Sequence, residues 1–370
     1  PEMVNVDSEL YKAHPDWAMD IPGCAHSEGR NQRILDLCNP EVSEYIIDSM
    51  TKVFSSANIA YVKWDMNRIF SDYYSKYLKA QGRPQGETAH RYVMALGRIM
   101  RTLTERFPHI LFEGCAAGGN RFDLGILCYF PQIWASDNTD AVSRAYIQEG
   151  LSYGYPMSTV SAHVSACPNH QTLRVTPLST RFNVAAFGIC GYECNLVDMS
   201  RAEKSEIKTQ IDIYKKWRHA MQFGCFYRQR TGNIHQWTVV DEEAGRAVGL
   251  IMQELVRANT QNEEYYAAGL DPEAVYSFYN RPLKHNVKEF GDLINTVAPI
   301  HIRQGSLLHG MVAKFVTMPG ETEKYELSGS MLMNCGVRLK QAFAATGFSE
   351  EVRHFPDFAS RLYFMKKISD

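Results

Sequence analysis

Residues 59–68 read IAYVKWDMNR, a short apolar run that ends abruptly in charged and polar side chains. Such a run is typical of a parallel strand that is buried on both faces. Side chains of a strand alternate between its faces, so Lys63 and Asp65 share one face and Trp64 lies on the other. Because parallel α/β folds carry their chemistry at the carboxyl ends of the strands, we place the candidate site where this strand stops.

Helices and further strands alternate around this stretch. Apolar residues recur at three and four positions from Pro40 to about Ser56, which predicts a helix directly before the strand. The same reasoning predicts strands over residues 33–37, 109–113, 132–135 and 185–189, a strand and loop over 156–171, and helices over 87–107, 141–153, 178–184 and 201–221. Repeated strand, loop and helix units predict a parallel sheet.

The pattern changes near residue 229. Short alternating runs over 235–240, 246–252, 265–272 and 362–365 favour antiparallel strands, whereas residues 284–322 show no recognisable pattern. Five βα strands exceed half of a (β/α)₈ TIM barrel. We therefore predict an α/β fold: a (β/α)₈ barrel, incomplete at its N-terminal side, over residues 1–228, followed by a C-terminal antiparallel β-sandwich domain over residues 229–370.

The composition narrows the class of function. With 39 Lys and Arg against 41 Asp and Glu, the formal charge of −2 gives no electrostatic reason to expect a nucleic acid or a membrane as partner. No apolar run approaches the roughly 20 residues of a transmembrane helix. Nine scattered cysteines without a C-x-x-C pair predict neither a zinc site nor a disulfide framework, and the apolar neighbours of Cys128 predict a reduced core thiol. The absence of an N-glycosylation sequon agrees with a cytoplasmic protein.

Two carboxylates stand at predicted strand ends, Asp65 and Asp137. Such a pair suits hydrolysis of a glycosidic bond, with one carboxylate as nucleophile or base and the other as acid. Each has a structural alternative: Asp65 caps the strand end or pairs with Lys63 or Arg68, and Asp137 is the N-cap of the helix that follows.

Other polar residues are weaker candidates. Gly118 and its neighbour Gly119 offer backbone amides that suit a clamp for hydroxyl groups or a phosphate nest, but no nucleotide-binding motif accompanies them. Cys115 is a possible nucleophile without an evident histidine base, so a sulfur packed against substrate is favoured. We interpret His163 and His170 as hydrogen-bonding scaffolds. A metal site of carboxylates and histidines stays an alternative, but no dense ligand cluster supports it, and we predict neither a metal nor a cofactor.

Four motifs together closely resemble the α-galactosidases of glycoside hydrolase family 36: YVKWDMNR at 61–68, the glycine segment at 115–123, SDNTDA at 136–141 and the segment 162–172. The resemblance runs from the first residues to the C-terminal SRLY at 360–363. It implies that Asp65 is the nucleophile and Asp137 the acid/base of a retaining mechanism. In such enzymes the two carboxyl groups lie about 5–5.5 Å apart.

The resemblance also implies the ligands and the setting of the site. It assigns sugar contacts to Lys63, Asn67, Arg30, Cys115 and Gly118, and an α-galactoside oligosaccharide of the melibiose or raffinose type as substrate. It implies no cofactor, and a homo-oligomer for the full-length protein. A positive charge on Lys63 is expected to favour the ionised form of Asp65.

Two departures from the family pattern qualify these expectations. Residues 116–120 are poorer in Ser and Gly than is usual in the family. Family members also carry an N-terminal β-sandwich and first barrel strands, with an Asp-Asp-Gly-Trp motif, to which nothing here corresponds. We therefore expect a C-terminal portion with little activity alone. The alternatives are an α-N-acetylgalactosaminidase, a transgalactosylase, or a non-catalytic assembly subunit.

Overall fold

The computed structural model describes residues 1–257, 263–296, 298–340 and 354–368. Two compact units divide the chain, Pro1–Asp137 and Asn138–Asp370, and each is described by itself. Within the described residues, no helix combines the length and the apolar character that crossing a membrane requires.

Three parallel strands organise the first unit: β3 (Tyr61–Asp65), β4 (Leu111–Cys115) and β5 (Gln132–Trp134). Lys63 pairs in register with Glu113, which in turn pairs with Gln132, so these three residues form one row across the strands. Asp65 pairs in register with Cys115 one row further on. This register brings the polar ends of β3 and β4 side by side.

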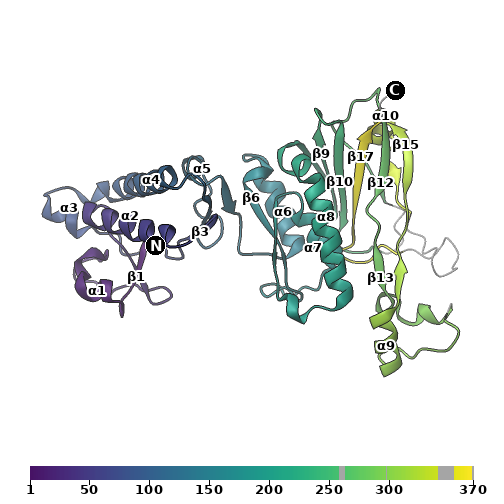
Figure 1. Ribbon diagram of the computed structural model, residues 1–370, viewed down its shortest axis with the longest axis horizontal. Helices are drawn as coiled ribbons and strands as arrows, with labels where there is room; N and C mark the ends of the chain where they lie inside the picture. The colour runs from purple at the N-terminus through teal and green to yellow at the C-terminus, as the bar shows by residue number, and fades with distance from the viewer. Residues whose placement is uncertain (258–262, 297, 341–353, 369–370) are drawn as a thin grey trace. The chain divides into compact units, whose positions relative to one another are not determined.

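Two helices that pack against each other accompany these strands, α2 (Pro40–Ser55) and α4 (Thr88–Arg106) (Figure 1). Asn39 caps α2 by accepting from the amide of Glu41, and Pro40 occupies the first helical turn, where its missing N–H costs nothing. Both predicted helices are confirmed to within two residues. The remaining elements of the unit are β1 (Met3–Asn5), α1 (Glu9–Ala13), η1 (Pro15–Trp17), β2 (Gln32–Ile34), α3 (Lys76–Ala80), η2 (Gln85–Glu87) and α5 (Leu124–Leu127).

The prediction that β3 is buried on both faces is wrong. Only Trp64 is fully buried, whereas Tyr61 on the opposite face is 44% exposed and the Lys63 side chain 37% exposed. The apolar character of the run comes from residues that alternate between the faces, so composition alone overestimated its burial. One face of β3 packs into the core and the other presents polar groups.

A buried carboxylate, Glu2, joins several elements of the first unit. Its side chain is 0% exposed. Trp64 Nε1 donates to Oε1 at 2.8 Å, both terminal nitrogens of Arg121 donate to the same oxygen at 3.0 Å, and the Tyr92 hydroxyl donates to Oε2 at 3.0 Å. These donors offset the cost of burying a charge.

The second unit begins with two further parallel strands, β6 (Val160–Ser165) and β7 (Ile189–Glu193). Its helices are α6 (Ala141–Leu151), α7 (Leu178–Ala185) and α8 (Arg201–Phe223), with short turns η3 (Met157–Thr159) and η4 (Leu196–Asp198). A capping box of Ser200 and Glu203 starts α8. All three helices confirm predicted ones.

The strand predicted over residues 185–189 is misplaced. Ala185 is the last residue of α7, and the amide of Gly188 bonds back to the Ala185 carbonyl at 3.1 Å, so the chain turns before β7 begins at Ile189. Ala186 and Phe187 are completely buried. A short buried run cannot be assigned to strand or turn from its apolar character alone.

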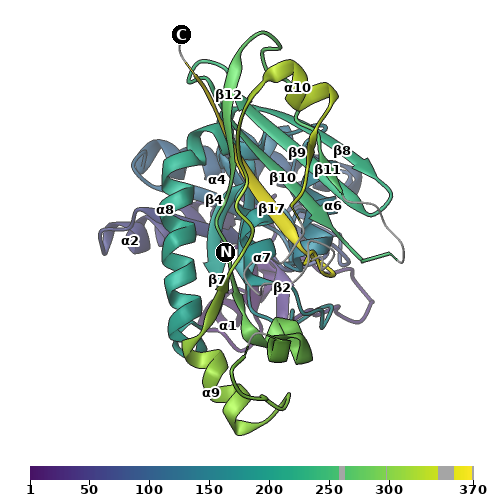
Figure 2. The ribbon, with the colours of Figure 1, turned by 90° about the vertical axis from the view of Figure 1, so that its right-hand side faces the viewer.

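A six-stranded antiparallel sheet forms the centre of the second unit. Its order is β15 (Lys324–Ser328), β12 (Val275–Asn280), β17 (Ser360–Lys367), β10 (Arg246–Gln253), β9 (Ile234–Asp241) and β8 (Cys225–Thr231). The helix α8 runs alongside it and contacts β9 and β10 (Figures 1 and 2). Antiparallel strands are confirmed at three of the four predicted runs; of residues 265–272, only Tyr265 is in a strand, β11 (Glu264–Tyr265).

Tyr265 covers the face of this sheet at a glycine. A Cβ added at Gly249 would collide with the Tyr265 hydroxyl, which hydrogen-bonds with Thr238 Oγ1 at 2.7 Å. Glycine at 249 therefore admits the ring. The smaller elements are β13 (Lys284–Asn286), η5 (Val287–Thr296), α9 (Leu307–Phe315), β14 (Thr317–Pro319), α10 (Gly329–Asn334) and β16 (Val337–Arg338), which pairs with β11.

Replacement of Glu2 should test how much the buried carboxylate contributes. In Glu2→Ala, Arg121, Trp64 and Tyr92 lose their acceptor, and we expect the free energy of unfolding to fall by about 3 kcal/mol. Urea unfolding followed by tryptophan fluorescence measures this. Glu9→Ala is the matched control, because the Glu9 side chain is 92% exposed and its loss should change stability by no more than about 0.5 kcal/mol. Equal stability of the two variants would contradict the assignment.

Candidate active site

The face of β3, β4 and β5 that bears Lys63 carries a row of polar side chains. Lys63 Nζ lies 3.5 Å from Glu113 Oε1. The buried Glu113 also accepts from the hydroxyl of Tyr61 and, at 3.5 Å, from the amide of Gln132. β3 therefore contributes two polar groups, and β4 and β5 contribute one each, to a network below the strand ends.

Asp65 stands at the end of β3 with its carboxylate oriented by a neighbouring side chain. Asn67 donates its side-chain amide to Oδ2, whereas Oδ1 is buried. The thiol of Cys115 also interacts with this carboxylate. The interpretation of Asp65 as an ion-pair partner of Lys63 or Arg68 is wrong: Lys63 pairs with Glu113, and Arg68 donates to backbone carbonyls and to Ser71. The carboxylate is thus oriented without being neutralised.

Asp137 follows β5, two strands away from β3. Trp134 Nε1 donates to Asp137 Oδ1 at 2.8 Å, and Lys63 Nζ lies 4.2 Å from the centre of the Trp134 ring. The cation over the ring connects β3 to β5 across β4. The N-cap interpretation of Asp137 is wrong, because Asp140 fills that role by accepting from the amide of Ser143 at 3.0 Å. The Asp137 carboxylate itself is exposed.

The loop after β4 presses against the backbone that carries Asp137. A Cβ added at Gly119 would lie 2.5 Å from the Ala135 carbonyl oxygen, and one at Gly118 would lie 3.1 Å from the Asp137 amide nitrogen. Gly118 also has a φ of +82°, which glycine adopts at little cost. Both glycines are therefore required for the close approach. The hydroxyl clamp stays a prediction.

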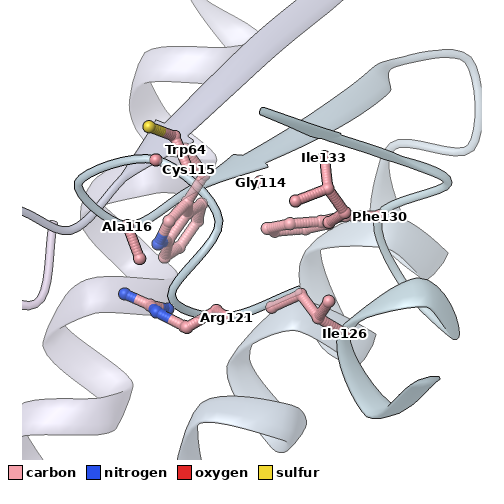
Figure 3. Close-up of a pocket in the computed structure, with 9 residues that line it drawn as sticks. Trp64, Gly114, Cys115, Ala116, Arg121, Ile126, Phe130 and Ile133 are labelled. Carbon is pink, nitrogen blue, oxygen red and sulfur yellow. The ribbon is translucent and has the colours of Figure 1, made fainter. Parts of the chain in front are cut away.

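Cys115 lies beside Asp65 but lacks the properties of a nucleophile. It is 7% exposed. Burial and, next, its interaction with Asp65 raise the pKa of the Cys115 thiol to about 12. Its sulfur points away from Trp64 (Figure 3). The thiol is therefore protonated at neutral pH and its sulfur belongs to the polar face.

The opposite face of the strands encloses a narrow apolar gap. Figure 3 shows the rings of Trp64 and Phe130 and the side chain of Ile133 around it. A Cβ at Gly114 would lie 3.0 Å from Ile133 Cδ1, so the packing is close. This gap belongs to the core and lies on the other side of β3 from Asp65. Cys128, predicted to be a core thiol, is exposed instead at the end of α5, where its Sγ lies 3.4 Å from the Leu124 carbonyl.

Arg30 lies on an exposed turn in which the backbones of Gly29 and Gln32 bond to each other. Arg68, from the segment after β3, stabilises this turn by donating hydrogen bonds to the carbonyls of Ser27 and Gln32. Arg30 has a φ of +55°, a conformation that is costly for a residue with a Cβ. The turn is thus held next to the YVKWDMNR segment, and a sugar contact from Arg30 stays a prediction.

The two histidines considered from the sequence lie in the second unit. His163 on β6 has its Nδ1 3.0 Å from Glu193 Oε2 on β7, in agreement with a hydrogen-bonding scaffold. His170 is exposed on the loop that follows β6. Neither observation gives these rings a role as base or ligand.

Sequence reasoning missed two residues of the site, Glu113 and Trp134. Both were read only as parts of strands. The sequence did contain a signal for both as site residues. Trp134 lies three positions before Asp137, and Glu113 ends the predicted strand that enters the glycine segment. Their partners, however, come from other strands and depend on the register.

Two known protein families match this chain. Residues 1–224 match the Melibiase family, and residues 234–365 match the glycosyl hydrolase family 36 C-terminal domain. A stretch of 279 residues is 47% identical to the α-galactosidase AgaA of Geobacillus stearothermophilus and covers 75% of this chain and 38% of that protein. The α-galactosidase Mel36A of Lactobacillus acidophilus is 44% identical over 278 residues, with the same coverage. The chain thus spans less than half the length of these relatives.

Solved structures agree with these matches. A variant of AgaA from G. stearothermophilus in complex with raffinose matches with a TM-score of 0.81 and 37% identity, over 100% of this chain and 44% of that one. The α-galactosidase of Lactobacillus brevis matches with a TM-score of 0.81 and 35% identity over the same shares. Because one family match covers more than half of its residues and the second covers most of the remainder, the chain belongs to the melibiase family and carries the C-terminal domain of glycoside hydrolase family 36.

Proposed function

We propose that residues 1–370 supply the nucleophile and the acid/base of a retaining glycoside hydrolase that releases terminal α-linked galactose from oligosaccharides of the melibiose and raffinose type. The observation that carries this proposal is the place of Asp65 at the end of β3, on the polar face, where Asn67 donates to its Oδ2 and orients the carboxylate. A positioned carboxylate at a strand end is the group that a covalent glycosyl-enzyme mechanism needs. The relatives with known activity are named α-galactosidases, and one was solved with raffinose.

The proposed reaction has two steps. The Asp65 carboxylate attacks the anomeric carbon while protonated Asp137 gives its proton to the departing glycosidic oxygen, which leaves galactose bound to Asp65 as an ester. Asp137, now a carboxylate, takes a proton from water, and the resulting hydroxide releases galactose with retained configuration. The hydrogen bond from Trp134 fixes the orientation of Asp137 in both steps. The mechanism requires the two carboxyl groups about 5–5.5 Å apart.

The remaining site residues are proposed as sugar contacts: Lys63, Asn67, Arg30, Cys115 and Gly118. Lys63 is suited to this role because 37% of its side chain is exposed, although its ammonium group pairs with Glu113. Cys115 would contribute a packed sulfur, and Gly118 would let a sugar approach the backbone closely.

We also propose how the units fit the family architecture. The parallel strands would form part of a (β/α)₈ barrel within residues 1–228, and the antiparallel strands a β-sandwich within 229–370. The two family matches, which end at 224 and begin at 234, support a boundary in this region. The β11–β16 pair would belong to the second layer, since Tyr265 covers a face of the six-stranded sheet.

The expected setting is a cytoplasmic protein that assembles as a homo-oligomer in its full-length form. A formal charge of −2 supports a neutral sugar substrate over a nucleic acid or an anionic membrane.

The catalytic pair is tested in two proteins. One is a chimera in which residues 1–370 replace the matching part of G. stearothermophilus AgaA, and the other is residues 1–370 alone. We expect the chimera to hydrolyse p-nitrophenyl α-galactoside and to release the α-anomer first, as followed by proton NMR. Asp137→Asn should lower kcat by roughly 10²–10⁴-fold, because general acid–base catalysis contributes that much, and Asp65→Asn should lower it at least equally.

Asp48→Asn is the matched control for this experiment, because Asp48 lies exposed on α2 and should leave the rate unchanged. A folded chimera that releases the β-anomer first contradicts the retaining mechanism. Undiminished rates in Asp65→Asn remove Asp65 from the role of nucleophile.

The protonation state of Cys115 is open to direct measurement. With a pKa of about 12, only about one thiol in 10⁴ is ionised at pH 8, and reactivity should rise only as the pH approaches the pKa. We expect iodoacetamide at pH 8 to label the exposed Cys24 long before Cys115, as read by peptide mass spectrometry of the native chain. Labelling of Cys115 as fast as Cys24 would instead indicate an activated thiolate.

A further inference from the structure

Three potential metal ligands converge in the second unit, far along the chain from the proposed catalytic residues. His285 belongs to β13, Glu289 lies four residues later in η5, and His354 precedes β17. One ligating atom from each lies within 4.8 Å of the other two. Nothing in the proposed glycosidase reaction uses these residues.

The spacing of the three atoms suits a common ion. Glu289 Oε2 lies 3.0 Å from His285 Nδ1 and 3.8 Å from His354 Nε2. Around a tetrahedral zinc ion with bonds of about 2.0–2.1 Å, neighbouring ligand atoms lie about 3.3 Å apart. Small movements of side chains would therefore bring all three atoms to bonding distance.

Hydrogen bonding between these groups accounts for only part of the arrangement. The 3.0 Å contact between His285 and Glu289 is a hydrogen bond. At 3.8 Å, His354 Nε2 is too far from Glu289 Oε2 to form one. An ion bound to both atoms, at about 2.0–2.1 Å from each, would fit this distance.

The surroundings hold the three groups in place. The amide of Asn286 donates to Glu289 Oε1 at 2.8 Å, which leaves Oε2 on the side of the imidazoles. The buried ring of Phe290 stacks on His354 at 4.7 Å between centroids and meets His285 edge-on at 6.1 Å. Fixed ligand orientation of this kind is what metal sites obtain from the residues around them.

We propose that His285, Glu289 and His354 bind one divalent transition-metal ion of the zinc type. Two imidazoles and one carboxylate suit zinc better than calcium or magnesium, which prefer all-oxygen ligands. The His285 and His354 side chains are 18% and 13% exposed and Glu289 is 44% exposed, so water can complete the coordination. The ion would join the β13–η5 segment to the residue that precedes β17 and stabilise the folded chain.

Zinc binding to the chelator-treated chain 1–370 tests this proposal by isothermal titration with zinc chloride. The exposed cysteines are alkylated first, because their free thiols would compete. We expect one equivalent to bind, and His285→Ala and His354→Ala each to weaken binding by at least about tenfold. His219→Ala is the matched control, since the His219–Asp241 pair, at 3.0 Å, reproduces the histidine–carboxylate contact without a third ligand among the residues that the structure describes. Its zinc affinity should equal that of the parent chain.

Thermal unfolding gives an independent readout, because an ion that binds the folded state raises Tm. We expect zinc to raise the Tm of the parent chain and of His219→Ala. Glu289→Gln, which keeps the shape of the side chain, should fold as the parent does without zinc and lose the zinc-dependent rise.

Equal zinc binding in the parent, His354→Ala and Glu289→Gln would place the ion elsewhere and overturn the proposal. Failure of the parent to bind zinc would overturn it as well. Neither readout depends on glycosidase activity, so the metal site and the proposed function are tested independently of each other.

Discussion

The buried carboxylate of Glu2 is the interaction on which the first unit depends most. A charge removed from water must be matched by donors, and Glu2 takes them from β3, from α4 and from the loop after β4. The donor on β3 is Trp64, the residue directly before Asp65. Since neighbouring side chains of a strand point to opposite faces, fixing Trp64 on the core side fixes Asp65 on the polar side. An acidic residue with no proposed part in the reaction thus orients the proposed nucleophile.

The helices α2, α4, α6, α7 and α8 and the parallel strands β3 to β6 could be predicted because they follow from local patterns, whereas β7 was misplaced. α2 and α4 show apolar residues at helical spacing, with a cap or a proline at their boundaries. β12 was not recognised, because it is defined by pairing with β17, about eighty positions later in the sequence, and with β15. Exposure was also harder to predict than secondary structure. The open face of β3 and the exposed Cys128 both depend on what packs against them, which no local pattern contains.

The residues of the candidate site could likewise be predicted only where local sequence patterns indicate them. Asp65 and Asp137 could be chosen because strand ends are visible in the sequence, and the N-cap alternative for Asp137 was removed only when Asp140 was seen to cap α6. The partners of Lys63 could not be chosen, since Glu113 and Trp134 reach it through the register of β4 and β5. His285 and Glu289 stand four residues apart and could have been noticed, but His354 is remote in sequence.

The contact between Gly118–Gly119 and the residues 135–137 has a consequence for how this family can diversify. A side chain at either glycine would push directly against the backbone that bears Asp137, so the loop cannot be reshaped there without displacing that carboxylate. Under the proposed mechanism, a change of substrate contacts at these two positions would also move the group that transfers the proton. The adjacent Ala117 is exposed, although its φ of +47° already strains the chain. Selection for new substrates would therefore be expected to change this exposed alanine while Gly118 and Gly119 stay constant.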